Sequence, residues 1–359
     1  MAEMKLAALR AYAVTRTLCK PVDLAAAVRN LGFVQIDPIR APARAQDLIL
    51  RHRVADYRAG DLEKRFPELP LVEDFVHVYG VLPESSLRLL HPRRRLHTWR
   101  VERDHPALAR NVVGHIERNG PTHPRDLTRA LGSARIVNGW GGSSAVTTRM
   151  LEALHYRGKL RVVRRNNGVK IYALAPARDP GPPLSVRAYQ LLQLLVRLYA
   201  PLSMASLRQL AKMVTEDSIP EASRERALAQ LLKSGWLARG VVEDVEYLWP
   251  ADESARAEAP DTVRLLAPFD PIVWDRRRFA RLWSWEYRFE AYTPPAKRRF
   301  GYYALPMLWR DRVIGWANVT LKSGRLDVAT GFAGEKPRSS RFVRQLEREI
   351  DSLARSLGN

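Results

Sequence analysis

The first part of the chain contains two different spacings of apolar positions. Apolar side chains recur at helical spacing over residues 5–18, and a proline opens a second helical pattern over residues 21–31. Residues 33–36 are mostly apolar and β-branched, which predicts a short strand. A further helical pattern covers residues 43–57. We interpret residues 1–104 as a winged-helix-like unit that carries this strand.

Residues 105–178 repeat this order more clearly. A helical pattern that starts near residue 105 is followed by a short helix at 124–131 and a third helix at 144–156. Two β-rich arms then flank residues 166–168, whose Asn and Gly tolerate the positive φ that a tight hairpin turn needs. Three helices and a hairpin predict a second winged helix.

The pattern returns after a linker rich in Pro and Gly, so residues 182–252 predict a third winged helix. Gly158 and Gly235 each end a helix before an apolar strand, which indicates an internal repeat of about 77 residues. The expected helices and wing are 186–199, 204–214, 221–234 and 236–249.

The last hundred residues change character, with short aromatic and β-branched runs between turn residues. For residues 260–335 this pattern predicts a small antiparallel β-barrel, and apolar positions at helical spacing predict a closing helix within 336–359. The expected strands are 289–293, 301–308, 313–321 and 325–329. The fold class is therefore α+β, with tandem winged helices followed by a barrel and a helix.

The net charge of the chain limits the classes of partner that it can bind. The chain holds 59 Lys and Arg against 38 Asp and Glu, a formal net charge of +21. Such a balance favours binding to a polyanion through release of counterions, although a merely soluble basic protein is the alternative interpretation.

The other composition signals exclude several classes. Cys19 is the only cysteine, so the chain has no intrachain disulfide and no cysteine-based metal site. We expect neither a cofactor nor a metal. No apolar run reaches the roughly 18 residues that a membrane span requires, and the N-terminus lacks a cleavable signal pattern, so we expect a cytoplasmic, nucleoid-associated protein without a membrane partner.

The predicted strand at 33–36 presents two polar groups at its end. Gln35 and Asp37 project from one face because alternate strand residues point the same way, and Pro38 ends the strand. Four arginines follow at positions 40, 44, 51 and 53, which favours an ionised carboxylate at neutral pH. An ionised Asp beside phosphate-binding arginines suits cleavage of a nucleotide's glycosidic bond. The alternative is a turn residue whose carboxylate caps backbone N–H groups.

Resemblance to a known family favours the catalytic interpretation. The segment LGFVQIDPIRAPARAQDLILRHRVADY resembles the signature region of winged-helix DNA glycosylases of the AlkZ and YcaQ type, which excise alkylated bases or unhook crosslinks. Three further stretches are similar to that family: VEDFVHVYGVLP, LLAPFDPIVWDRRR and GYYALPMLWRDRVIG. The final Asp of the polar pair resembles the YcaQ branch.

The resemblance implies roles for particular residues. Gln35 and Asp37 inherit the catalytic positions, and Asp37 would stabilise an oxocarbenium-like sugar and orient a water. The implied activity is that of a monofunctional, monomeric glycosylase, since nothing points to a lyase lysine. Its partner would be double-stranded DNA with alkylated purines or interstrand crosslinks, without an obligate protein partner.

Basic residues along the chain are the expected contacts to DNA or the lesion. His77 either touches DNA or is a structural histidine inside a helix, with Glu73 one turn before it as a reserve carboxylate. Asp270 is favoured as a buried anchor. The expected DNA-binding set is Arg40, Arg44, Arg51, His77, Arg93, Arg94, Arg95, Arg164, Arg165, Arg276 and Arg277.

One departure and two alternatives stay open. Where relatives tend to have an Arg and an acidic residue after a strand glycine, this chain has Trp316, Ala317 and Asn318, so any lesion contact from that pair is in doubt. A non-catalytic tandem winged-helix regulator fits the charge and the wings equally well, but it would need a preferred sequence and spaced half-sites. An RNA-binding protein is the second alternative.

Overall fold

The structure is a computed structural model that describes residues 2–3, 5–18, 20–93, 99–137, 142–177, 181–255, 258–322 and 325–358. The chain forms two compact units. Unit 1 contains residues 1–62, 193–210 and 229–359, and unit 2 contains residues 63–192 and 211–228. In the described part of the chain, four helices contribute residues to both units: α4 (Asp61–Arg65), α10 (Leu184–Tyr199), α11 (Met204–Thr215) and α12 (Glu221–Lys233).

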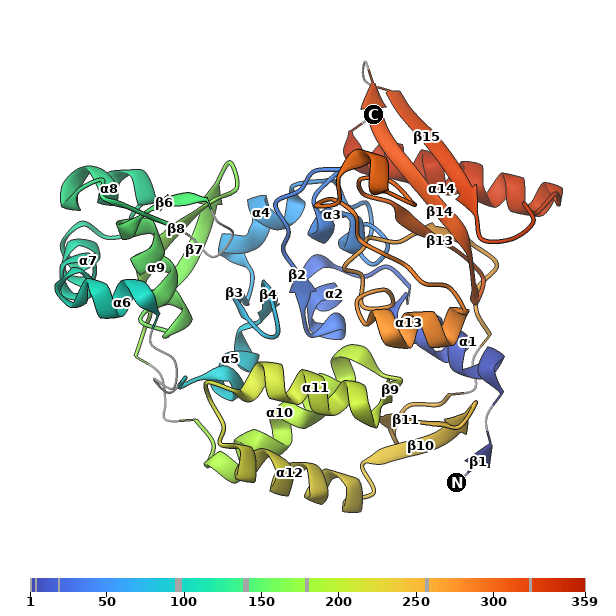
Figure 1. The fold of residues 1–359 in the computed structure, drawn as a ribbon, viewed down its shortest axis with the longest axis horizontal. Coiled ribbons are helices and arrows are strands. Elements are labelled where there is room, and N and C mark those ends of the chain that lie inside the picture. The colour runs from blue at the N-terminus through green and yellow to red at the C-terminus, as the bar shows by residue number, and fades with distance from the viewer. Residues whose placement is uncertain are drawn as a thin grey trace. The chain divides into compact units, whose positions relative to one another are not determined.

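The N-terminal part of unit 1 has the predicted order of helix, helix, strand and helix (Figure 1). The elements are α1 (Leu6–Thr17), α2 (Leu24–Leu31), β2 (Val34–Gln35) and α3 (Ala45–Leu50). Asp23 caps α2 by accepting a hydrogen bond from the Ala26 N–H at 2.9 Å. The predicted helix 43–57 is too long, because the chain leaves α3 after Leu50 in a series of turns.

A second sheet of unit 1 is built around the predicted third wing. Strands β10 (Leu237–Val242) and β11 (Val245–Pro250) form an antiparallel hairpin, as predicted. Two short strands extend it: β1 (Ala2–Glu3) pairs parallel with β10, and β9 (Leu202–Ser203) pairs antiparallel with β11.

The predicted β-barrel is wrong. Its strands form an open four-stranded antiparallel sheet in the order β12 (Val263–Leu265), β13 (Leu305–Trp309), β14 (Arg312–Lys322) and β15 (Arg325–Phe332). The predicted strand at 289–293 is instead loop and turn, where the buried Glu290 carboxylate accepts hydrogen bonds from backbone N–H groups further along the loop. The two edge strands do not pair with each other, and the closing helix α14 (Ser340–Leu357) packs against both of them (Figure 1).

Unit 2 begins with α4 (Asp61–Arg65), which spans its boundary, and the 3₁₀ turn η1 (Phe66–Glu68). The stretch around His77 is a β-hairpin, β3 (Leu71–Phe75) and β4 (Tyr79–Pro83), and not the helix we expected. His77 therefore lies in the turn, and Glu73 is on a strand. Short helical segments follow: η2 (Glu84–Ser86), α5 (Leu87–Leu90) and α6 (Arg100–Asp104).

The middle of unit 2 has the elements predicted for residues 105–178. Helices α7 (Pro106–Asn119), α8 (Pro124–Leu131) and α9 (Val146–Tyr156) precede the hairpin β7 (Leu160–Asn166) and β8 (Val169–Leu174). A short pair that we did not predict, β5 (Arg135–Val137) and β6 (Ser143–Ala145), precedes α9. The helices and the hairpin share one apolar core, which includes Val112, Leu127, Met150, Leu151 and Tyr172.

Candidate active site

Gln35 and Asp37 lie where β2 ends in unit 1, and both side chains are partly exposed. Asp37 Oδ1 accepts a hydrogen bond from the Ile39 N–H at 2.9 Å, and the Asp37 N–H donates to Gln46 Oε1 on α3 at 3.3 Å. The carboxylate thus forms the local turn that the alternative interpretation predicted. This turn uses only one of its two oxygens, so the same carboxylate keeps an acceptor for a substrate or a water.

The Gln35 amide is the second polar group of the site. Its Oε1 atom is buried and has no hydrogen-bond partner among the described residues. A buried carbonyl oxygen without a donor is costly in a protein, so this atom suits a donor supplied from outside, such as a hydroxyl or a water.

The electrostatic setting of Asp37 differs from the prediction. Burial raises the pKa of the Asp37 carboxyl, and the hydrogen bond from the Ile39 N–H lowers it only in part. Within the part of the chain that the structure describes, no arginine forms an ion pair with Asp37. The expected cationic neighbourhood is therefore wrong for this carboxylate, and its basicity is raised instead of lowered.

Aromatic side chains from the C-terminal half of unit 1 contribute to this region. Tyr303 is buried, and its ring meets Phe289 edge to face with centroids 5.4 Å apart. Burial, followed by the negative charge of Asp37, raises the pKa of Tyr303 well above its ordinary value. We did not single out Tyr303 from the sequence, although it belongs to the family-like stretch GYYALP.

Helix α13 (Arg276–Trp283) supplies one partly buried cation to the same region. The Arg276 guanidinium lies over the Tyr287 ring, 4.6 Å from its centroid, and its Nη1 donates to the Val273 carbonyl at 2.5 Å. Burial lowers the pKa of Arg276. The neighbouring Arg277 is exposed, as a DNA contact requires.

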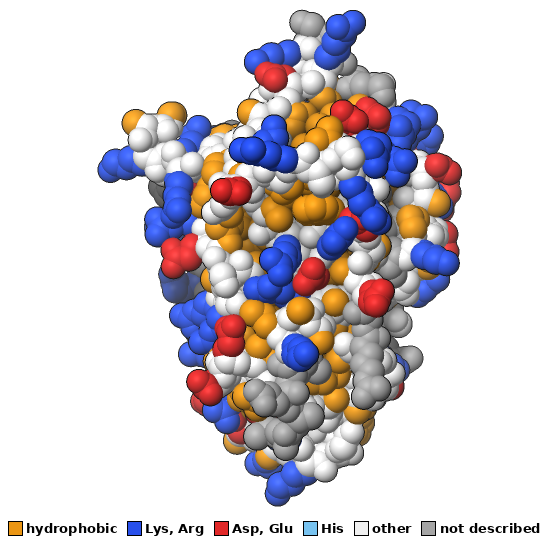
Figure 2. All heavy atoms as spheres, turned by 90° about the vertical axis from the view of Figure 1, so that its right-hand side faces the viewer, with side chains coloured by type: hydrophobic (Ala, Val, Ile, Leu, Met, Phe, Trp, Pro, Cys, Tyr) orange, Lys and Arg blue, Asp and Glu red, His pale blue; other side chains and the backbone are white. Residues whose placement is uncertain are grey.

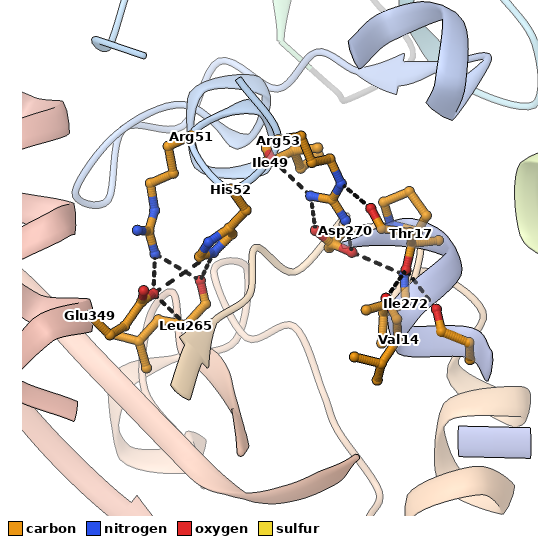
Figure 3. Close-up of polar contacts among 12 residues, drawn as sticks. Val14, Thr17, Ile49, Arg51, His52, Arg53, Leu265, Asp270, Ile272 and Glu349 are labelled. Atoms are coloured by element: carbon orange, nitrogen blue, oxygen red, sulfur yellow. Dashed lines mark hydrogen bonds and ion pairs between the residues drawn. The ribbon is translucent and has the colours of Figure 1, made fainter. Parts of the chain in front are cut away.

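Two ion pairs of unit 1 are buried (Figure 3). Arg51 forms an ion pair with Glu349 on α14, and both side chains are 2% exposed. Arg53 binds Asp270 through two hydrogen bonds of 2.8 and 3.0 Å. The structural role expected for Asp270 is therefore confirmed, whereas Arg51 points into the core and its placement does not fit the predicted DNA contact.

The remaining predicted residues of unit 1 are accessible. Arg40 is exposed in the turn after Asp37, and Arg44 is partly exposed at the start of α3. In the face that Figure 2 shows, Lys and Arg side chains are interspersed with hydrophobic and acidic ones. The net positive charge is therefore not gathered into one continuous patch on that face.

Several residues of unit 2 that we predicted to contact DNA are buried or form hydrogen bonds within the unit. Burial lowers the pKa of His77 to about 3, so this histidine is neutral at physiological pH. Arg93 donates to Asp74 at 2.9 Å and to the Tyr156 carbonyl at 2.8 Å. These contacts favour a structural role for Arg93. Arg94 and Arg95 lie outside the described residues.

Some basic side chains of the predicted wing in unit 2 point into the unit, and others are exposed to solvent. Arg165 binds Glu73 through two hydrogen bonds of 2.7 Å, and this partner outweighs the burial that would raise the pKa of Glu73, so the pKa is lowered. Glu73 is therefore the ion-pair partner of Arg165, which does not fit the role of a reserve carboxylate. Burial lowers the pKa of Lys170 to about 8, and its ammonium lies 3.5 Å from the centroid of the Tyr79 ring. Arg161 and Arg164 are exposed on β7, and Arg164 lies beside a cavity of about 410 Å³ that Arg125 and Arg129 also line.

No cluster of three or more His, Cys, Asp or Glu side chains in these residues could hold a metal ion. None of the helices in the described ranges is long and apolar enough to cross a bilayer.

Comparisons with known proteins show the family and the fold of the chain. Residues 28–356 match the family described as DNA glycosylase AlkZ-like. The structure of the DNA glycosylase AlkZ of Streptomyces sahachiroi is similar, with a TM-score of 0.68 at 16% sequence identity, over 99% of this chain and 98% of that one. At this identity the structural likeness shows the fold, and the match over nearly the whole chain shows the family. The chain belongs to the AlkZ-like family of DNA glycosylases.

Proposed function

We propose that this DNA glycosylase hydrolyses the N-glycosidic bond of N7-alkylated purines in duplex DNA, with Asp37 and Gln35 as its catalytic residues. The observation that carries the proposal is the pair of partly exposed polar groups at the end of β2, each with an acceptor oxygen to which no described residue donates a hydrogen bond. The accessible arginines Arg40, Arg44 and Arg277, together with Arg164 on the wing, would contact phosphates.

The chemistry starts from a purine that already carries a positive charge. When the C1′–N9 bond breaks, its electron pair goes to the base and neutralises that charge, so no acid is needed to help the base leave. The sugar becomes an oxocarbenium-like cation, which the Asp37 carboxylate stabilises electrostatically. A water held by Gln35 then attacks C1′ and transfers a proton to Asp37, whose raised pKa suits this role. The product is an abasic site.

The partial exposure of Gln35 and Asp37 favours bulky substrates in addition to single alkylated bases. Gln35 and Asp37 remain partly exposed, so an adduct or an interstrand crosslink need not enter a closed pocket to reach them. Flipping enzymes, in contrast, enclose the extruded base. We therefore include crosslinked N7-alkylguanine among the proposed substrates.

The experiment compares excision from a duplex with one N7-methylguanine by the wild type, Asp37→Asn and Asp56→Asn, under single-turnover conditions with alkaline scission of abasic sites. Asp56 is exposed in the same unit, at φ 51°, a conformation that Asn tolerates, so the control loses the same charge without touching the site. We expect Asp37→Asn to lose roughly 10²–10³-fold in rate and Asp56→Asn to match the wild type.

Equal rates for all three proteins would show that Asp37 is not catalytic. A wild type that binds the duplex but excises nothing, from this substrate or from a crosslinked one, would contradict the proposed substrate class.

A further inference from the structure

The loop formed by residues 290–303, which we call the Tyr292 loop, is anchored by hydrogen bonds to a buried carboxylate. The buried Glu290 carboxylate accepts hydrogen bonds from the N–H groups of Arg299, Phe300 and Gly301, at 3.0, 2.7 and 3.1 Å. Burial alone would raise the pKa of Glu290, but these three donors lower it. The loop therefore closes around its own carboxylate and has a defined shape.

Two side chains of β14 also support the loop. Asn318 Nδ2 donates to the Phe300 carbonyl at 2.7 Å. The Trp316 ring stacks on Trp285 and meets Phe300 edge to face, with centroids 6.1 and 5.0 Å apart. Asn318 and Trp316 thus hold the loop from the strand β14.

The outer surface of the loop is aromatic and basic. Tyr292 is 74% exposed, and its ring lies edge to face on Phe289, which packs in turn on Phe269. Tyr302 is 44% exposed. Single exposed apolar side chains are normal on a protein surface, but two exposed tyrosines on one short loop form a cluster of the kind that marks a binding site.

Apart from the buried Glu290, the charged side chains of the loop are all basic. Lys297 and Arg299 are exposed, and the Arg298 guanidinium lies 5.1 Å from the centroid of the Tyr302 ring. The sequence has no acidic residue between positions 291 and 303, and the Glu290 carboxylate is buried against backbone N–H groups, so the loop has no exposed carboxylate beside these cations. Aromatic faces interleaved with cations fit a nucleic acid strand, whose bases stack and whose phosphates attract the cations.

One end of the loop reaches the candidate active site. Tyr303, the last residue of the loop, packs against the Phe289 ring, and the negative charge of Asp37 helps to raise its pKa. The Tyr292 ring packs against the same Phe289 ring. The exposed tyrosine and the region of the carboxylate are therefore joined by a short series of contacting aromatic rings within one unit.

We propose that the Tyr292 loop binds DNA beside the lesion, with Tyr292 stacked on a nucleobase exposed there and with Lys297 and Arg299 against neighbouring phosphates. The proposal rests on the proposed function for the position of the lesion at Asp37. It assigns Tyr292 a positioning role, since its ring contacts the DNA and not the reacting atoms.

The test measures binding separately from excision. The probe is a duplex with a tetrahydrofuran abasic analogue opposite 2-aminopurine, which has no glycosidic bond to cleave at the gap and reports stacking by fluorescence. Affinity and its salt dependence are measured for the wild type, Tyr292→Ala, Tyr292→Phe and the double variant Lys297→Ala/Arg299→Ala. The matched control is Arg344→Ala/Arg348→Ala, which removes two exposed arginines of α14 and the same charge.

We expect Tyr292→Ala to bind roughly 5- to 100-fold more weakly with an unchanged salt slope, and Tyr292→Phe to bind like the wild type, because stacking needs the ring and not the hydroxyl. The double loop variant should lower the slope of log K against log salt by about two, and the α14 pair should change it much less.

Several outcomes would overturn the inference. They are wild-type affinity for both loop variants, equal weakening by Tyr292→Phe and Tyr292→Ala, or an α14 control that changes the salt slope as much as the loop pair. If the wild type excises N7-methylguanine while the loop variants bind normally, the inference fails and the proposed function stands. If loop-dependent binding occurs without any excision, the loop contact stands and the proposed function fails.

Discussion

Arg53 and Asp270 form a buried bidentate ion pair within unit 1. Arg53 Nη1 and Nη2 donate to the two carboxylate oxygens, and the exposed fractions of the two side chains are 1% and 0% (Figure 3). Arg53 Nε also donates to the Thr17 carbonyl at 2.7 Å, and Asp270 Oδ1 accepts from the Ile272 N–H at 3.0 Å. The pair joins the turns after α3 to the segment that leads into α13, so it fixes two elements that carry candidate site residues.

Breaking this pair from one side should destabilise the protein strongly. We expect Asp270→Ala to lower the free energy of unfolding by about 3–5 kcal/mol, because it leaves a buried guanidinium without its counter-charge. Urea denaturation followed by tryptophan fluorescence measures the change. The double variant Arg53→Met/Asp270→Leu should lose less than Asp270→Ala, since it removes both charges. Asp327→Ala, which breaks an exposed pair with Lys322, is the control, and an Asp270→Ala loss no larger than the control's would contradict the argument.

Local patterns in the sequence predicted much of the fold. Asn167 and Gly168 both have positive φ, 51° and 85°, and the hairpin turns where their residue types indicated. The second helix of the chain likewise ends at Gly32, with φ 71°. Turns and caps are readable because the residues that set them are neighbours in the chain.

Contacts between distant positions could not be predicted in this way. Arg51, Arg93 and Arg165 were expected on the surface, yet each has a buried carboxylate partner: Glu349, Asp74 and Glu73. A solvated arginine and a paired one look alike in a sequence, because the partner is chosen by tertiary packing. The prediction of a closed barrel was wrong for the same reason, because closure depends on whether two strands far apart in the chain pair with each other.

The raised pKa of Asp37 should appear in the pH dependence of excision. Because burial raises that pKa, we expect the rate to fall on the acid side at a pH above about 4, the ordinary value for an Asp. A single-turnover rate profile from pH 4 to 8 measures it. An acid limb at or below the ordinary value would contradict the assignment.

The same shift predicts a separate effect on stability. The native state binds the Asp37 proton more tightly than the unfolded state does, so the ionised carboxylate destabilises the fold above its unfolded pKa. Asp37→Asn should therefore be as stable as the wild type or more stable at pH 7, although its activity is lost. Thermal unfolding of both proteins at pH 7 tests this, and a clearly less stable variant would show that the carboxylate supports the fold.

His52 makes the stability of unit 1 sensitive to acid. Burial, followed by the charge of Arg51, lowers the pKa of His52 well below its ordinary value, and its ring nitrogen contacts the Leu265 carbonyl at 3.0 Å. The unfolded state takes up a proton below pH about 6.5 while the native state does not, so stability is lost as pH falls below that value.

The expected loss is about 1.4 kcal/mol per pH unit for this one histidine. Urea denaturation at pH 7.5 and 5.5 measures it in the wild type and in His52→Gln. The variant should lose less stability between these two pH values, whereas His115→Gln, at a partly exposed position, should behave like the wild type. Equal losses in all three proteins would rule out His52 as the acid-sensitive group.

Gly301 gives an independent way to disturb the Tyr292 loop without touching its exposed side chains. Its φ is +121°, and a Cβ atom there would lie 2.2 Å from Asn318 Oδ1. Gly301→Ala therefore meets both backbone strain and a clash with the residue that anchors Phe300. We expect it to lower the free energy of unfolding by about 1–3 kcal/mol.

The consequence for DNA is more specific than the loss of stability. Gly301→Ala should weaken binding to the abasic duplex as Tyr292→Ala does, because the altered loop no longer presents the tyrosine. Gly334→Ala is the matched control, since its added Cβ meets nothing within 4 Å and its φ is not positive. Gly301→Ala/Asn318→Ala should recover part of the stability, as the clash is removed while the strain at φ +121° remains. Binding that is unaffected by Gly301→Ala would mean that the shape of the loop does not matter for DNA.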